Sequence, residues 1–152
     1  MIHLEPKQIS ELWEVDGSLR DVYAEQMTIE RWGAFLSLAQ RVECRYTSDG
    51  EPTIAPDAGT IFGVRDHSQL LALLVEGVQI NCHFFVEDEL ELDIDPREVV
   101  TAGAHEAVLR FLAAVATAIQ LPLSITPENM QSSPFLSYEP ERACWTWHES
   151  NR

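Results

Sequence analysis

The alternation of acidic and aliphatic residues in the segment 89–95 constrains the fold of this chain more than any other feature. The segment reads Glu89-Leu90-Glu91-Leu92-Asp93-Ile94-Asp95. Successive side chains of a β-strand point to opposite faces of the sheet. The segment therefore predicts a strand with every carboxylate on one face and every aliphatic side chain on the other.

The preceding segment, 78–86, predicts a strand that pairs with this acidic strand as a hairpin. A three-residue turn, Glu87-Asp88-Glu89, makes the apolar faces of the two strands match. The apolar pairs are then Val86 with Leu90, Phe84 with Leu92 and Cys82 with Ile94. On the opposite face of the hairpin, the same register pairs Phe85 with Glu91, His83 with Asp93 and Asn81 with Asp95.

Two other segments have the apolar spacing of amphipathic helices. The first spans 28–42, where Thr28 suits the N-cap position, and the second spans 104–120, where Pro122 follows the last turn. A shorter helix is predicted over 5–15. Strands are predicted for the short periodic segments 18–26, 43–47, 60–64, 123–126, 135–138 and 143–148.

The apolar segment 70–75 has two interpretations. Asp66-x-x-Gln69 resembles a capping box, which would open a short helix. A turn at Glu76-Gly77 would instead join a strand to the strand 78–86, with Val75 facing Val78. Both interpretations remain open from the sequence.

These elements predict one α+β domain that spans residues 1–152. Its core would be an antiparallel sheet with two main helices packed on it. No internal repeat divides the chain, nor does any linker.

The charge of the chain indicates the chemistry of its partners. The formal net charge is −15 at pH 7, with 25 Asp and Glu against 10 Lys and Arg. Such a field repels phosphate, so we expect neither direct nucleic-acid binding nor attachment to an anionic membrane. A basic protein is the favoured partner.

The N-terminal residues, the apolar stretches and the cysteines together predict a cytoplasmic protein. The first residues lack the apolar run of a secretory signal, and the apolar stretches at 70–75 and 108–119 are too short to span a bilayer. Cys44, Cys82 and Cys144 are an odd set without metal-ligand spacing, so we expect small buried side chains in a reducing compartment.

Signatures of catalysis are missing, which favours a binding protein over an enzyme. The chain has no phosphate-binding loop, no dinucleotide-binding glycine pattern and no serine-hydrolase elbow. His105-Glu106 begins like a zinc protease motif, but Leu109 stands where the second histidine is needed. We therefore expect no catalytic set, no bound metal and no cofactor.

A metal-dependent hydrolase is the enzyme alternative, with His83, Asp93 and Asp95 as its site. Alternate residues of one strand diverge, whereas the ligands of a hard cation converge on one point. Asp95 also suits the N-cap of a turn that Pro96 opens. That cap would remove one carboxylate from the ligand set.

The acidic hairpin is the predicted interaction surface, because it concentrates unbalanced charge beside an aromatic residue and a histidine. Its candidate partner-binding residues are His83, Phe85, Glu87, Asp88, Glu89, Glu91, Asp93 and Asp95. The predicted function is that of an immunity protein, or antitoxin, that masks a cationic toxin such as a nuclease. One alternative is a nucleic-acid mimic that inhibits a defence or DNA-binding protein, and the simplest is a solvated face that only keeps the chain soluble.

Overall fold

The computed structural model describes residues 4–64 and 66–149. Within them the chain forms the helices α1 (Pro6–Leu12), α2 (Ile29–Ala39), α3 (Ala58–Gly63) and α4 (Ala102–Ile119), and a 3₁₀ turn, η1 (Pro96–Glu98). The strands are β1 (Arg20–Glu25), β2 (Glu43–Ser48), β3 (Glu51–Pro52), β4 (Gln69–Val75), β5 (Val78–Val86), β6 (Glu89–Ile94), β7 (Leu123–Pro127), β8 (Leu136–Glu139) and β9 (Cys144–Trp147).

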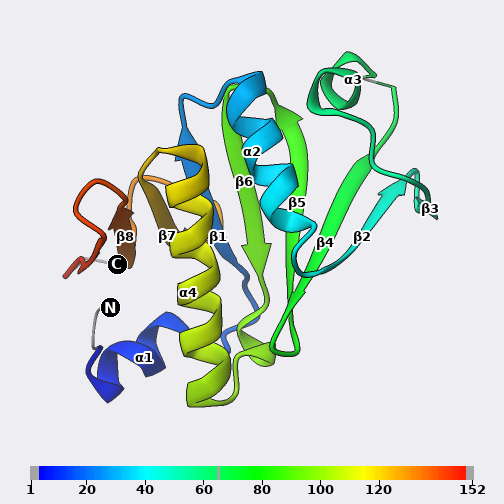
Figure 1. The fold of residues 1–152 in the computed structure, drawn as a ribbon. Coiled ribbons are helices and arrows are strands. Elements are labelled where there is room, and N and C mark those ends of the chain that lie inside the picture. The colour runs from blue at the N-terminus through cyan, green and yellow to red at the C-terminus, as the bar shows by residue number, and fades with distance from the viewer. Residues whose placement is uncertain (1–3, 65, 150–152) are drawn as a thin grey trace.

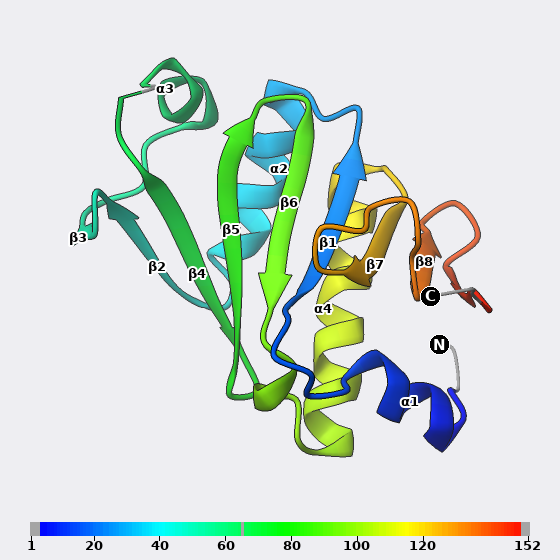
Figure 2. The same ribbon diagram turned by 180° about the vertical axis from the view of Figure 1, so that it is seen from behind.

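The strands join in one antiparallel sheet of nine strands, in the order β3-β2-β4-β5-β6-β1-β7-β8-β9 (Figure 1). Strand β1 lies between β6 and β7, although it precedes both by a long stretch of chain. Helices α2 and α4 cover one face of the sheet, and the view from behind shows the other face without a helix over its centre (Figure 2). The predicted α+β fold, with an antiparallel sheet and two main helices, is confirmed.

Rows of apolar side chains form the core between the sheet and these two helices. Val22, Leu92 and Ile125 are paired across β1, β6 and β7, and all three are fully buried. Above this row α2 contributes Trp32 and Phe35. The core face of the sheet is therefore apolar from strand to strand, and the alternation within β1 and β6 leaves polar side chains on the opposite face.

Threonine caps open both main helices; the cap at Thr28 was predicted, whereas α4 begins at Ala102, two residues before the predicted start. The Thr28 side chain accepts a hydrogen bond from the Arg31 amide, and the Thr101 side chain accepts one from the Ala104 amide. Helix α4 is long and apolar enough to cross a membrane by length and composition, but 56% of it is buried inside the fold. This burial is that of a core helix.

The segment 70–75 is a strand, so the capping-box interpretation is wrong. Val75 pairs with Val78, and Leu73 pairs with Ile80. Glu76 and Gly77 both have positive φ, of 48° and 79°, as the tight turn of a two-residue hairpin requires. The hairpin places three buried apolar pairs on the core face, Leu71 with Cys82, Leu73 with Ile80 and Val75 with Val78.

Two other predictions are wrong. Segment 60–64 belongs to helix α3, because Asp57 caps this helix by accepting a hydrogen bond from the Thr60 amide. Cys44 and Cys144 are exposed, since each lies on a strand near an edge of the sheet, and only Cys82 is buried.

Candidate functional site

The hairpin of β5 and β6 has a register that differs from the predicted one. Glu87 and Asp88 form a two-residue turn, so Val86 pairs with Glu89 rather than Leu90. A bulge between His83 and Val86 then places His83 opposite Glu91 rather than Asp93. The slip is one residue at Val86 and two residues from His83 onward. Val86 therefore lies opposite Glu89 and is exposed, whereas beyond the bulge His83 and Cys82 keep their predicted faces. Hydrophobic alternation therefore could not distinguish the two registers.

Strand β1 brings a second row of acidic residues against the acidic strand. Asp21 pairs directly with Asp93, Glu25 pairs directly with Glu89, and Tyr23 lies between them opposite Glu91. We call this surface the acidic face. Its residues are Asp21, Tyr23, Glu25, His83, Phe85, Glu89, Glu91 and Asp93, on the face of β1, β5 and β6 that α2 and α4 leave uncovered.

His83 is the titratable cation of this face, and its neighbours hold it in place. Its Nε2 lies 2.5 Å from Asp93 Oδ2, and its ring stacks on Phe85 with the ring centroids 4.9 Å apart. Asn81 donates a second hydrogen bond to Asp93, at 3.0 Å. The hydrogen bond to Asp93 raises the pKa of His83 above its ordinary value.

The carboxylates of the acidic face are partly withdrawn from water. Burial is the main cause that raises the pKa of Asp21 and of Glu91, and nearby carboxylates raise both further. Burial also raises the pKa of Tyr23, whose hydroxyl donates to Asp21 Oδ2 at 3.1 Å. Each raised pKa means that the charged form of that side chain is disfavoured on the acidic face.

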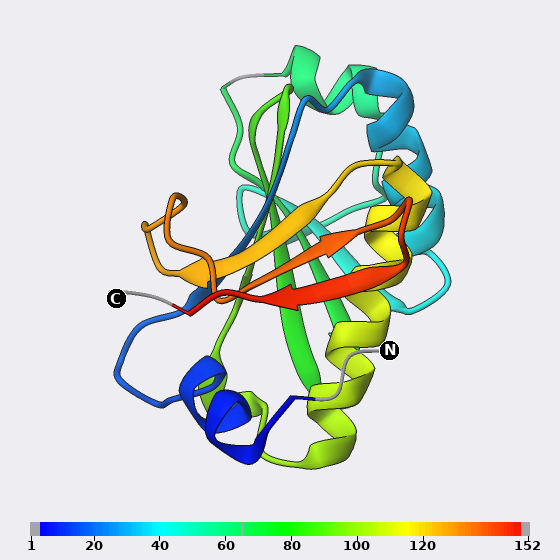
Figure 3. The same ribbon diagram turned by 90° about the vertical axis from the view of Figure 1, so that its left-hand side faces the viewer.

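The loop between β7 and β8 contacts both ends of the row of β1 carboxylates. The backbone amide of Asn129 donates to Asp21 Oδ2 at 2.9 Å. The side-chain amide of Gln131 donates to both Glu25 and Glu89, at 3.2 and 2.9 Å. Seen edge-on, this loop projects on the side of the sheet opposite α4 (Figure 3). Neutral donors thus bind the carboxylates here without balancing their charge.

Lysine and arginine do not neutralise this surface. Strands β1, β5, β6 and β7 lie wholly within the described residues and contain one such residue, Arg20. Its side chain points away from the acidic face and is 1% exposed. Arg45 of β2 pairs with Ala72 of β4 and so lies at the margin of the sheet. The acidic face keeps its charge unbalanced.

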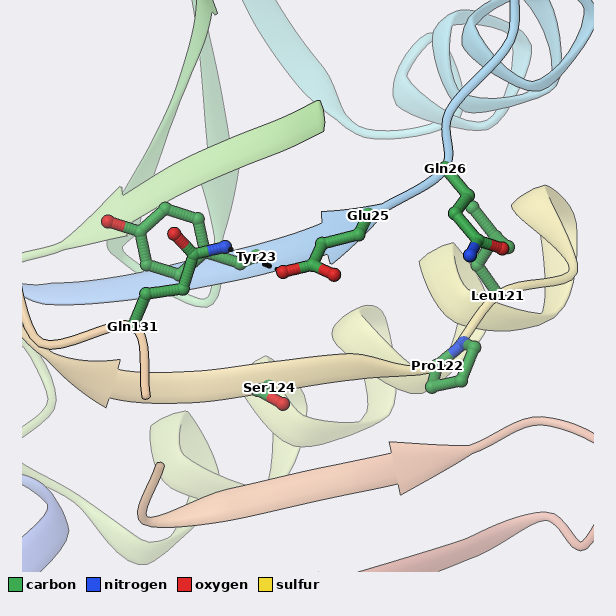
Figure 4. A pocket seen from close by; sticks show the side chains of 7 residues that line it. All are labelled: Tyr23, Glu25, Gln26, Leu121, Pro122, Ser124 and Gln131. Carbon is green, nitrogen blue, oxygen red and sulfur yellow. Dashed lines mark hydrogen bonds between the residues drawn. The ribbon is translucent and has the colours of Figure 1, made fainter. Parts of the chain in front are cut away.

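A pocket opens where the acidic face meets the end of α4 (Figure 4). Its volume is about 330 Å³, and its walls come from the end of β1, the start of β7 and the loop that contains Gln131. Glu25 and Gln131 lie on one side of it, and Leu121 and Pro122 lie on another. The pocket therefore combines an acidic and an apolar wall.

The structure places most of the predicted partner-binding residues together. His83, Phe85, Glu89, Glu91 and Asp93 share the acidic face. Glu87 and Asp88 form the exposed turn at its end, where their backbone carbonyls accept hydrogen bonds from the Trp32 indole and the Met27 amide.

Asp95 is engaged elsewhere. Its carboxylate caps η1 by accepting from the Arg97 amide, and it forms an ion pair with the Arg97 side chain at 2.7 Å. The sequence predicted this capping role for Asp95 and also a place among the partner-binding residues. The hydrogen bonds with Arg97 and its charge lower the pKa of Asp95, which therefore stays ionised. Its negative charge is offset by the paired Arg97, so it adds little to the acidic face.

Sequence reasoning missed the contribution of β1 and of the loop after β7. Asp21, Tyr23 and Glu25 alternate with apolar residues, which was the available signal for a polar strand face. Nothing local in the sequence shows that β1 pairs with β6. Gln131 carried no signal, because it lies in an irregular loop.

Metal-binding geometry is not found in the described part of the chain. No group of three or more His, Cys, Asp or Glu side chains there is placed to hold a metal ion. Comparisons with protein-family models, with curated proteins and with solved structures find no match for this chain. The function must therefore be argued from the site itself.

Proposed function

We propose that this protein binds a basic protein partner through the acidic face and masks the cationic surface of that partner. The observation that carries the proposal is the pairing of like charges across β1 and β6, Asp21 with Asp93 and Glu25 with Glu89. Like charges directly opposite each other destabilise a sheet, by roughly 0.2–1 kcal/mol for each pair. A role in recognition explains why the chain has them.

Solubility alone would not require this arrangement. Charges on separate exposed positions keep a protein soluble and do not repel one another closely. Here Asp21 is 6% exposed, and the Asp93 side chain is 14% exposed. Charges in a partly desolvated surface act over a longer range than fully hydrated ones, so they attract and orient an incoming cation more strongly.

The type of partner follows from this chemistry. A surface that binds phosphate groups is rich in Lys and Arg, and an acidic protein of this size can cover it. The proposed function is therefore that of a cytoplasmic immunity protein, or antitoxin, whose target is a cationic toxin such as a nuclease. No observation favours the metal-dependent hydrolase, because the carboxylate of Asp95 is already bound to Arg97.

The test is affinity capture from native cells at low salt with tagged wild-type protein and two charge variants. In the first variant Glu89, Glu91 and Asp93 become Lys. In the matched control Glu30, Glu106 and Glu141, all exposed and outside the acidic face, become Lys. Both variants change the net charge by the same amount, so they separate an acidic face from overall charge.

The expected result is a basic protein that the wild type and the control retain and the face variant loses. The purified pair should then bind at least about tenfold more weakly when the face is reversed. A partner that both charge variants bind equally well would contradict the proposal. A neutral variant, Glu25, Glu89 and Glu91 to Gln, serves if the Lys variant fails to fold, as judged by circular dichroism.

A further inference from the structure

We propose that the pocket beside Glu25 is an anchor site for a single arginine side chain of the partner. This inference rests on the proposed function, which it makes specific, since it names the group that the protein recognises. The pocket volume, about 330 Å³, lies at the lower end of the range for small-ligand sites. A single long side chain suits such a volume better than a folded segment does.

The walls of the pocket match the two parts of an arginine side chain. Leu121 and Pro122 offer apolar surface to the aliphatic stem. Glu25 and Ser124 offer oxygen acceptors to the guanidinium group. A guanidinium has five N–H donors in one plane, whereas a lysine ammonium presents a compact charge, so several spread acceptors favour arginine.

Gln131 independently indicates a site for a donor between two carboxylates. Its side-chain NH₂ group donates to Glu25 Oε1 at 3.2 Å and to Glu89 Oε2 at 2.9 Å. A guanidinium NH₂ group has the same donor geometry and adds a positive charge. Gln131 is exposed and lies in a loop, so it can turn aside and leave both carboxylates to the incoming cation.

The end of α4 adds a second attraction for a cation. Leu121 and Pro122 follow directly after this 18-residue helix, whose C-terminus carries partial negative charge. Arg31 Nε donates to the Ile119 carbonyl at 2.8 Å, which shows that a guanidinium binds at this terminus and also offsets part of its charge. The ring of Tyr23 also lines the pocket, and guanidinium groups bind well against aromatic rings.

The test is a titration with N-acetyl-arginine amide, followed by the backbone amide signals of the ¹⁵N-labelled full chain. N-acetyl-citrulline amide has nearly the same shape without the charge, and N-acetyl-lysine amide has the charge without the planar fork. We expect the arginine compound to shift the signals of Gln26, Ser124 and Gln131. The lysine compound should bind several-fold more weakly, and the citrulline compound should cause no comparable shift.

Two variants make the result specific to the pocket. Glu25→Gln should weaken the arginine compound about tenfold, because it removes the charge that pairs with the guanidinium. Glu30→Gln, on the exposed side of α2, should leave binding unchanged. Equal binding by Glu25→Gln, or shifts centred on His83 and Glu91 instead, would overturn the anchor site.

Failure of this inference is distinguishable from failure of the proposed function. If the arginine compound does not bind at the pocket while reversal of Glu89, Glu91 and Asp93 still abolishes capture of a basic partner, the proposed function stands and the anchor is wrong. If the arginine compound binds as described and no basic partner depends on the acidic face, the anchor site stands and its assignment to a masking function is wrong.

Discussion

Glu91 shows at the scale of one residue how recognition and stability oppose each other in this protein. Its carboxylate lies between Tyr23 and His83, and burial together with the nearby Asp21 raises its pKa. A raised pKa means that the folded state disfavours the charged form. The contribution of this group to stability is therefore present below its unfolded pKa and is lost as the pH rises through its folded pKa.

Neutralising this side chain should stabilise the fold. We expect Glu91→Gln to raise the free energy of unfolding at pH 7 by roughly 0.2–1 kcal/mol, the range for a cross-strand charge contact. The gain should disappear at a pH below the ordinary value of 4.5, where wild-type Glu91 is protonated. Urea denaturation at both pH values measures it. A loss of stability at pH 7 would show that attraction to His83 outweighs the repulsion.

His83 provides a second prediction at this scale, with a different pH range. Its pKa is raised, chiefly by the hydrogen bond to Asp93. Its contribution to stability is therefore fully present below its unfolded pKa of about 6.5 and is lost as the pH rises through the folded pKa. We expect the imidazole signals to titrate above the ordinary value in the wild type and closer to it in Asp93→Asn. NMR titration of the ring protons measures the change. Identical titration in both proteins would contradict the role given to Asp93.

At the scale of the element, the buried side chain of Arg20 connects α1 to the sheet. Its guanidinium donates to the Leu12 carbonyl at 2.6 Å and to the Glu14 carbonyl at 3.1 Å, directly after the end of α1. It also lies over the Phe135 ring, 5.1 Å from the centroid. One side chain thus satisfies carbonyls that the helix itself leaves unpaired.

Removing this guanidinium should destabilise the protein far more than an exposed change does. We expect Arg20→Met to lower the free energy of unfolding by roughly 2–4 kcal/mol, since carbonyls bonded to a charged donor lose their partner. Arg142→Met, in an exposed turn, should change it by less than about 0.5 kcal/mol. Denaturant midpoints compare the two variants. A similar small effect in both would mean that water replaces the guanidinium.

Helix α1 also depends on a neutral histidine of α4. His105 is 6% exposed, and its Nδ1 accepts a hydrogen bond from the Trp13 indole at 2.9 Å. Burial lowers the pKa of His105, so the protonated form is disfavoured in the folded state. The stability from this group is present above the unfolded pKa and is lost as the pH falls through about 6.5 towards the folded pKa.

This histidine should make the docking of α1 sensitive to acid. We expect the wild type to lose more stability than His105→Gln between pH 7.5 and pH 5, because the Gln oxygen accepts from Trp13 without titrating. The difference between the two proteins cancels the opposite effects of His83 and His67, whose pKa values are raised. Urea midpoints at the two pH values measure it, and parallel curves for both proteins would rule out the effect.

At the scale of the whole molecule, the acidic face should act mainly on the rate of association. In the proposed function the net charge of −15 attracts the basic partner, and the acidic face is where that partner would dock. We expect Glu89→Lys to slow association with the captured partner several-fold and to change dissociation less, with an effect that shrinks as salt rises. Stopped-flow mixing at two ionic strengths tests this. A change confined to dissociation would indicate a buried contact instead of steering.

Local patterns of sequence predicted much of the fold because they depend only on neighbouring residues. The alternation in 89–95 determined which side chains of β6 face the core, and the cap at Thr28 determined where α2 begins. Helix α3 was mistaken for a strand, because a single turn around Asp57 has too few residues to show a helical period. The hairpin register beyond the bulge was missed since a two-residue slip leaves the faces of Cys82 and His83 unchanged.

The sequence by itself determined that this protein has an acidic strand face, two amphipathic helices and a large negative net charge. Only the tertiary structure decided that β1 lies beside β6, which doubles the acidic row, and that Gln131 joins Glu25 to Glu89 at the edge of a pocket. The physical reason is the distance along the chain over which each signal acts. Periodicity and capping act over a few residues, whereas strand order depends on how all the apolar faces of the chain are buried together.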